Sequence, residues 1–212
     1  MKILNEIAGH LEHGDHERTT ELVQQAMEQG TPVEAILNDG LIAGMNVVGE
    51  KFRLHEIFLP DVLLAAKAMT AGLTLLKPAL IKEKVPSRGK VVIGSVHGDL
   101  HDIGKNLVGI MLQGAGFEII DLGNDVPAER FVDTAVDEGA PVIGMSALLT
   151  TTMSTMNKVV ELVRERGLAD RVKVIVGGAP VSMDFANEIG ADAYGYDAAN
   201  AVESVKALLG VT

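Results

Sequence analysis

The stretch KVVIGSVHGDLHDIGKN, residues 90–106, decides the fold of this chain. It opens with a β-branched run typical of a buried strand, passes through a polar segment bracketed by glycines, and leads into a helical pattern. Four more short apolar runs follow, at residues 117–123, 141–147, 172–178 and 191–196. Longer segments separate them, and several of these can be read as amphipathic helices. Five such βα units predict a five-stranded parallel sheet covered by helices on both faces.

The residues before this stretch have helical patterns throughout. Asp15 is a candidate N-cap for a helix that Gly30 closes, and Pro60 stands where a later helix would begin. Pro78 is expected to end or kink that last helix, and residues 81–89 form a linker. Between them, apolar residues recur three or four positions apart at Leu37, Leu41, Met45, Val48 and Phe52. The pattern predicts a four-helix bundle over residues 1–84 and an α/β domain over 85–212.

Composition excludes several classes of function. The chain has no cysteine, so disulfides, thiolate zinc sites and iron–sulfur clusters are excluded, as suits a reducing cytoplasm. The net charge is −11 and no basic patch is present, so nucleic acid is not an expected partner. The N-terminal residues do not resemble a secretory signal, and no uninterrupted apolar run approaches the roughly 20 residues that span a bilayer. We therefore expect a cytoplasmic protein without a membrane partner.

The loop after the first expected strand carries the densest group of chemically active side chains. His97, Asp99, His101 and Asp102 are four ionisable residues within six positions. Ligands of parallel sheets bind at the carboxyl ends of the strands, which is where this loop begins. The loop is therefore the candidate functional site.

Phosphate-binding interpretations fit this loop poorly. A phosphate loop needs four residues between its glycines and a Ser or Thr after the lysine. Here five residues separate Gly98 from Gly104, and Asn106 follows Lys105. The glycine pattern of dinucleotide-binding loops is absent as well. A plain polar loop, with Asp102 or Gly104 capping the next helix, stays open.

Two metal-binding interpretations also stay open. A hydrolytic site could use His97, Asp99, His101 and Asp102, although no further histidine follows in this half of the chain. Alternatively, His101 is a single axial ligand. Asp99 lies two residues before it and can hydrogen-bond one imidazole nitrogen while the other binds the metal. Gly104 would leave room for a large group against the backbone. The single-ligand interpretation asks least of the rest of the chain.

The spacing of Asp99, His101 and Gly104 resembles the D-x-H-x-x-G signature of B12-binding domains. The wider stretch GDLHDIGKNLVGIMLQGAGFEIIDLGNDVP is similar to methionine synthase and to stand-alone corrinoid proteins. The resemblance continues in Ser146-Ala147-Leu148, which matches an S-x-L motif, and in Gly177-Gly178. In the helical half, residues 45–49 and 58–60 resemble the cap over the upper corrin face. The resemblance implies a Rossmann-like (flavodoxin-like) domain with an N-terminal four-helix bundle cap.

The same resemblance assigns roles to individual residues. His101 would bind the cobalt of cobalamin as its lower ligand, and Asp99 would tune the basicity of its imidazole. Ser146 would be the third member of a proton relay with these two residues. Phe52 and Leu59 would shield the upper face of the corrin. Asn38 departs from the Glu that methionine synthase has at the aligned cap position. The remaining residues expected to bind the cofactor lie around His101, at the corrin edge or along the nucleotide tail. They are Gly98, Leu100, Asp102, Ile103, Gly104, Leu148, Thr150, Gly177, Gly178 and Ala198.

The function that the resemblance implies is that of a methyl carrier, which does not catalyse alone. Cobalamin, bound base-off with histidine on cobalt, would cycle between Co(I) and methyl-Co(III) and is expected as methylcobalamin or hydroxocobalamin. The implied partners are a substrate:corrinoid methyltransferase, a methylcobalamin:acceptor methyltransferase acting on a folate or thiol, and a reductive activase. Two alternatives are a B12-dependent sensor, whose helix-turn-helix we do not find, and an adenosylcobalamin mutase subunit, which would pair with a barrel.

Overall fold

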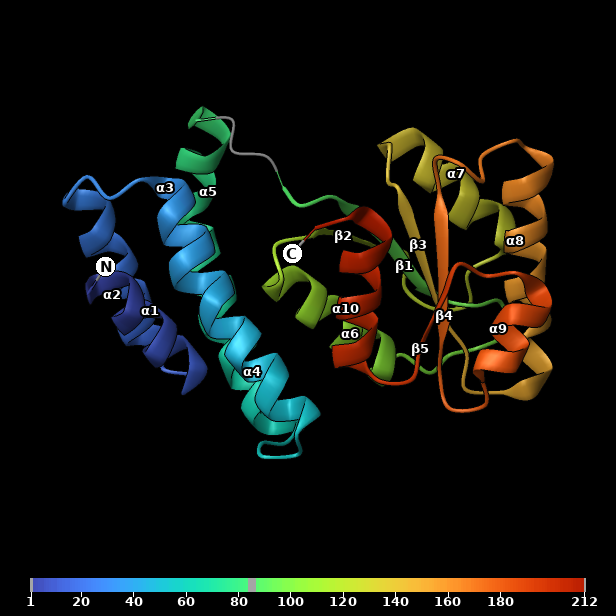
Figure 1. Cartoon of the computed structure of the whole chain (residues 1–212), viewed down its shortest axis with the longest axis horizontal. Helices are drawn as coiled ribbons and strands as arrows, with labels where there is room; N and C mark the ends of the chain where they lie inside the picture. Colours follow the sequence, from blue (N-terminus) through green and yellow to red (C-terminus); the bar gives the residue numbers. More distant parts are fainter. Residues whose placement is uncertain (1, 84–86, 212) are drawn as a thin grey trace. The chain divides into compact units, whose positions relative to one another are not determined.

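A computed structural model describes residues 2–83 and 87–211 of the chain (Figure 1). The chain divides into two compact units, the first made up mainly of residues 1–86 and the second of most of residues 87–212. The boundary expected between residues 84 and 85 falls outside the described residues and stays a prediction.

The first unit is helical. Its elements are α1 (Lys2–Glu12), α2 (His16–Glu28), α3 (Val33–Ala35), the π-helical segment η1 (Ile36–Ile42), α4 (Ala43–Arg53) and α5 (Leu59–Glu83). Because α3, η1 and α4 follow one another without a break, residues 2–83 form four helical rods. Helix α1 contacts α2, η1 and α4, and α5 contacts α2 and α4. The expected four-helix bundle is confirmed.

The ends of these helices follow from local chemistry. The Asp15 side chain accepts a hydrogen bond from the Arg18 amide at 3.1 Å, so it is the predicted N-cap of α2. Of the two outcomes expected at Pro78, an end to the helix is wrong, because α5 continues to Glu83, whereas a kink stays a prediction. A proline inside a helix removes one donor and crowds the preceding turn, but α5 already has more than four turns before that point. Residues 81–83 of the expected linker are therefore helical.

Helix α5 is long and apolar enough, by length and composition, to cross a bilayer. The expectation based on uninterrupted apolar runs missed this, because Lys67 and Lys77 break the sequence without lowering its average hydropathy much. The helix packs against α2, and Val62, Ala68 and Met69 are buried. A core helix of a helical bundle passes the same test of length and composition.

The second unit is built around a parallel sheet. Its strands are β1 (Lys90–Ser95), β2 (Glu118–Asp121), β3 (Val142–Ser146), β4 (Lys173–Gly177) and β5 (Ala193–Gly195). They pair in the order β2-β1-β3-β4-β5, and every pair is parallel. This is the flavodoxin-like order, so the expected five-stranded α/β domain is confirmed.

Helices cover both faces of this sheet. They are α6 (Ile103–Gly114), α7 (Ala128–Glu138), the short 3-10 helix η2 (Thr150–Thr152), α8 (Ser154–Glu165), α9 (Met183–Ile189) and α10 (Ala198–Leu209). Helices α6 and α10 lie on one face, and α7, α8 and α9 lie on the other (Figure 1). Phe131 of α7 and Met156 of α8 are fully buried against the sheet. Burial on both faces explains why the strands are nearly continuous apolar runs rather than alternating ones.

The strand order positions the candidate site. From β1 the chain crosses to β2 on one side of the sheet, and from β2 it returns to β3 on the other side of β1. The loops after β1 and β3 therefore begin side by side, with Ser95 and Ser146 paired in register. In open α/β sheets, ligands bind in the crevice at this reversal of strand order.

The Gly177-Gly178 pair has a structural requirement of its own. Gly178 has a φ of 120°, and a Cβ there would lie 1.9 Å from the Ala147 carbonyl oxygen. A Cβ on Gly177 would lie 2.9 Å from the Gly195 carbonyl oxygen. The ends of β3, β4 and β5 therefore approach too closely for side chains here, whatever ligand lies nearby.

We predict that Gly178→Ala destabilises the protein by about 3 kcal/mol, because both backbone strain and a backbone clash result. Urea unfolding measures the effect. Gly139→Ala is the matched control, since Gly139 also has a positive φ of 64° but has open space around it. It should cost only about 1 kcal/mol. Equal losses for the two variants would contradict the close-approach explanation.

Candidate functional site

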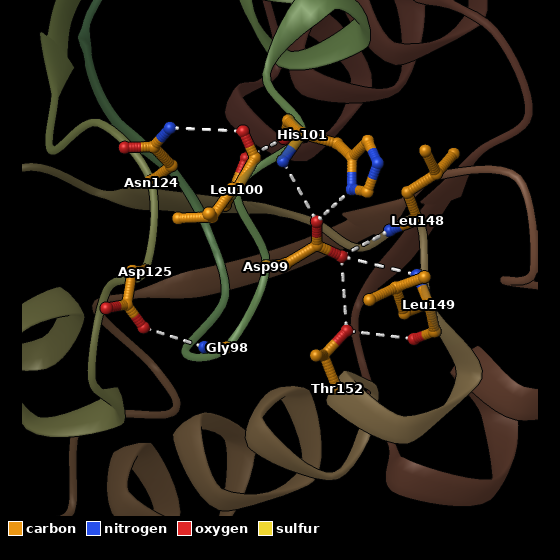
Figure 2. A network of polar contacts seen from close by, with 10 residues as sticks. Gly98, Asp99, Leu100, His101, Asn124, Asp125, Leu148, Leu149 and Thr152 are labelled. Carbon is orange, nitrogen blue, oxygen red and sulfur yellow. Dashed lines mark hydrogen bonds and ion pairs between the residues drawn. The ribbon is translucent and has the colours of Figure 1, made fainter.

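Asp99 is the centre of a hydrogen-bond network at the carboxyl end of the sheet (Figure 2). Its side chain is fully buried. Oδ1 accepts from the His101 amide at 3.0 Å and from His101 Nδ1 at 2.8 Å. Oδ2 accepts from the Leu148 and Leu149 amides at 2.7 and 3.3 Å, and from Thr152 Oγ1 at 3.2 Å. One carboxylate thus joins the loop after β1 to the loop after β3.

These donors set the ionisation of Asp99. Burial by itself would raise the pKa of the carboxyl group, because a charge is disfavoured away from water. The backbone N–H groups of Leu148 and His101, followed by the His101 ring and the Leu149 amide, outweigh burial and lower the pKa of Asp99 to about 2. Asp99 is therefore a carboxylate at neutral pH.

The Asp99 carboxylate fixes the tautomer of His101. Because the ionised carboxylate can only accept, Nδ1 of the imidazole carries a hydrogen, and in the neutral ring Nε2 therefore has the lone pair. Figure 2 shows Nδ1 facing Asp99 and the other ring nitrogen on the far side of the ring. The His101 side chain is 54% exposed, and its only hydrogen bond found within described residues 87–211 is the one from Nδ1 to Asp99. The site offers one oriented imidazole nitrogen that can bind a metal.

Three other predicted residues, in the loops after β1 and β3 and at the start of α6, have exposed aliphatic side chains. Leu100 and Ile103 are more than 70% exposed, and Leu148 is also exposed. A Cβ on Gly104 would meet nothing within 4 Å, so the backbone there is open to a large ligand as expected. Asp102 is half-buried directly before α6. The exposed aliphatic side chains and the open backbone at Gly104 are accessible to a large ligand with apolar parts.

The remaining predicted residues lie in several places. Ser146 is half-buried at the end of β3, but the hydrogen bonds to Asp99 come from other groups, so the relay role of Ser146 stays a prediction. Thr150 is exposed in η2, and Ala198 is buried at the start of α10. Phe52 in α4 and Leu59 at the start of α5 are half-buried within the helical unit. Their contacts with a cofactor stay predictions.

Sequence reasoning did not identify five residues as members of this network, one of which is Leu149, whose amide donates a hydrogen bond to Asp99. Thr152 and Ser95 are buried hydroxyls, and Ser95 Oγ donates to the His101 carbonyl oxygen at 2.6 Å. Asn124 Nδ2 donates to the Leu100 carbonyl oxygen at 3.1 Å, and the Asp125 carboxylate accepts from the Gly98 amide at 2.7 Å. Asn124 and Asp125 follow β2, so the strand-end rule that found His101 could have found them too.

The hydrolytic-metal interpretation does not fit this geometry. His97 Nδ1 lies 2.7 Å from Asp125 Oδ1, while Asp99 uses both oxygens for hydrogen bonds. Among the described residues, no group of three or more His, Asp or Glu side chains is arranged to hold a metal ion. His101 therefore stands alone as the candidate ligand of the loop.

Comparison with known families matches both parts of the chain. A family model described as a B12 binding domain matches residues 89–205, and a second with the same description matches residues 3–77. This chain belongs to the B12-binding domain family. The family resemblance noted for the loop at Asp99 and His101 is confirmed.

Relatives and solved structures extend this assignment over the whole chain. A corrinoid protein of Desulfitobacterium hafniense (strain Y51) is 43% identical over 99% of each chain. Dimethylamine corrinoid protein 3 of Methanosarcina acetivorans is 45% identical over 98% of this chain and 97% of the relative. One chain in the crystal structure of the methanol:cobalamin methyltransferase complex of Methanosarcina barkeri matches with a TM-score of 0.87 and 32% identity. The match covers 100% of this chain and 81% of the matched chain. A cobalamin-binding protein of Desulfitobacterium hafniense DCB-2 matches with a TM-score of 0.80 and 33% identity, covering 97% and 98%.

The residues of this B12-binding domain fit a cobalamin. If a cobalamin is bound, His101 Nε2 is the nitrogen that could hold its cobalt, because Asp99 engages the other ring nitrogen. The exposed Leu100, Ile103 and Leu148 offer apolar contacts beside it. The open space at Gly104 removes a steric obstacle.

We predict that the cofactor-free protein loses stability in acid through Asp99. Its pKa is about 2 in the folded protein, below the ordinary value of 3.8, so its contribution of roughly 2 kcal/mol is complete above about pH 5 and is lost as the pH falls toward 2. The stability advantage of the wild type over Asp99→Asn should shrink by about 1 kcal/mol between about pH 6 and pH 3. Urea unfolding at several pH values measures both. Parallel pH curves for the two proteins would contradict the assignment.

Proposed function

We propose that this chain is a corrinoid methyl carrier that binds cobalamin base-off, with His101 as the lower ligand of cobalt. The observation that carries the proposal is the hydrogen bond from His101 Nδ1 to the buried Asp99 carboxylate, which leaves Nε2 free in a B12-binding domain. Relatives named as corrinoid proteins match nearly the full length of the chain, which supports the carrier role.

Bound cobalamin would supply a cobalt centre that takes up and releases a methyl group, between Co(I) and methyl-Co(III). The chain's own residues then control the lower ligand. The Asp99 carboxylate accepts a hydrogen bond from the Nδ1–H of His101 and makes the imidazole a stronger donor at Nε2. Because the pKa of Asp99 is about 2, the proton of this pair resides on the imidazole at neutral pH. Ser146 is proposed as a further member of this relay.

Other residues would bind the rest of the cofactor. Leu100, Ile103 and Leu148 would contact the corrin, with Thr150 at its edge. Gly177, Gly178 and Ala198 would lie along the nucleotide tail, in addition to the packing role that the close backbone approach gives both glycines.

The helical unit would serve as the cap. Phe52 and Leu59 would exclude water and oxidants from the upper face of the corrin, which both reactive cobalt states require.

The proposed partners are methyltransferases. The matched complex from Methanosarcina barkeri is a methanol:cobalamin methyltransferase, and other relatives are named for dimethylamine and trimethylamine. These names support a methyltransferase that loads the carrier. We propose in addition a second methyltransferase that unloads it onto a folate or thiol. A reductive activase would restore oxidised cobalt. We propose a cytoplasmic location, where such partners and reductants are present.

The ligand assignment predicts that His101→Ala binds cobalamin without histidine ligation. The visible absorption of the reconstituted variant should be that of base-off cobalamin, and nitrogen hyperfine splitting should be absent from the electron paramagnetic resonance spectrum of the Co(II) form. His97→Ala is the control, because this second imidazole of the loop is paired with Asp125 and should leave the spectra unchanged. If His101→Ala and the wild type give the same spectra, the ligand assignment is wrong.

A further inference from the structure

The loop between β2 and α7 lies beside residues 96–102, which we call the ligand loop, and forms several hydrogen bonds with it and with Ser95 directly before it (Figure 2). The Gly123 carbonyl oxygen accepts from the Ser95 amide at 2.9 Å, and the Val126 amide donates to the Ser95 carbonyl oxygen at 3.0 Å. Asn124 Nδ2 donates to the Leu100 carbonyl oxygen at 3.1 Å. Residues 123–126 therefore support the ligand loop at both its start and its middle.

Asp125 makes the most contacts of this supporting loop. Its Oδ1 accepts from the Gly98 amide at 2.7 Å and lies 2.7 Å from His97 Nδ1. Its own amide donates to the Asp99 carbonyl oxygen at 3.0 Å. Asp125 thus binds the backbone at two points, the Gly98 amide and the Asp99 carbonyl oxygen. The second point belongs to the residue whose carboxylate orients His101.

The backbone of Asp125 is itself in an unusual conformation. Its φ is 55°, and besides His55 it is the only non-glycine residue among those described with a positive φ. The left-handed region is unfavourable for residues with a Cβ, although Asp and Asn tolerate it better than most. Such a conformation persists where surrounding contacts enforce it, often at functional sites. Here it is the conformation that lets the side chain and the amide of Asp125 bind the same loop together.

We infer that Asp125 is a positioning residue for cofactor ligation: its two-point grip on residues 98 and 99 sets the place from which Asp99 orients His101. The inference rests on the proposed function and deepens it. Gly98 has a φ of 82°, so the ligand loop turns sharply at the gripped residue and its amide has no partner within a strand or helix. Without Asp125, the turn at Gly98 would lose the contact that anchors it.

The electrostatics agree with this geometry. The Gly98 N–H bond holds the pKa of Asp125 below its ordinary value of 3.8, with His97 acting in the same direction. Asp125 is therefore a carboxylate at neutral pH, and a hydrogen bond from an amide to a charged oxygen is stronger than one to a neutral oxygen.

Three variants separate the acceptor from the charge and from the backbone conformation. Asp125→Gly relieves the positive φ but removes the acceptor, whereas Asp125→Asn keeps an acceptor oxygen and tolerates the same backbone. Asp133→Ala serves as the control. It removes another exposed carboxylate, whose partner is Arg166 at 2.6 Å and which forms no hydrogen bond or ion pair with the described residues of the ligand loop. Thermal unfolding establishes that all three fold.

The first measurement uses the protein without cofactor. Amide hydrogen exchange at Gly98 and His101 should accelerate at least ~10-fold in Asp125→Gly, the change expected for losing a hydrogen bond to a charged group, and should stay near wild type in Asp125→Asn and Asp133→Ala. Unchanged exchange in Asp125→Gly would overturn the grip. This arm does not depend on cobalt ligation.

The second measurement uses the cobalamin-loaded protein. The ratio of histidine-free to histidine-ligated cobalt, read from visible absorption, should rise about 10-fold in Asp125→Gly and be restored in Asp125→Asn. An equal ratio in Asp125→Gly and the wild type would overturn the positioning role. If the wild type itself shows no histidine ligation, the proposed function fails, whereas the exchange result still judges the contact between Asp125 and the loop.

Discussion

The buried carboxylate of Asp99 is the interaction on which the candidate site depends. A charge with no exposure to water is costly unless hydrogen bonds surround it, and here five donors do so. Two come from His101 and three from residues 148–152, so the carboxylate is stable only if the loops after β1 and β3 keep their relative positions. The orientation of His101 therefore depends on the stability of the sheet, because Asp99 links its ring to the ends of two neighbouring strands rather than to one loop alone.

The strand order makes this arrangement possible. Because β1 and β3 are neighbours with Ser95 opposite Ser146, the two loops leave the sheet at the same height. The loop after β2 then closes in from the other side through Asn124 and Asp125. Three loops that are distant in sequence thus surround one short segment. The reversal of strand order that separates the paths of the β1 and β3 loops is the same feature that opens space for a ligand between them.

The glycine pair at the end of β4 shows that a family motif can have two physical causes. Gly178 is required because its backbone lies against the Ala147 carbonyl group, a contact that no residue with a Cβ could make. The proposed passage of the nucleotide tail would use the same absence of side chains. A comparable overlap occurs at Asp125, whose unfavourable backbone conformation belongs to the contact that supports the ligand loop.

The sequence by itself determined the class of each unit and the place of the site. Apolar periodicity predicted the helical rods, β-branched runs predicted the five strands, and the spacing of Asp99 and His101 predicted their hydrogen bond, because a two-residue separation in an extended loop brings both side chains to one side. The expected end of the helix at Pro78 was wrong, because a long helix with many hydrogen bonds already formed tolerates the loss of one more. Only the tertiary structure identified the other partners of Asp99. Leu148 and Thr152 lie 49 and 53 residues away, and Leu148 contributes a backbone amide, which every residue except proline has and no sequence pattern marks. Which amides reach a given carboxylate is decided by strand order and register, and those exist only once the chain has folded.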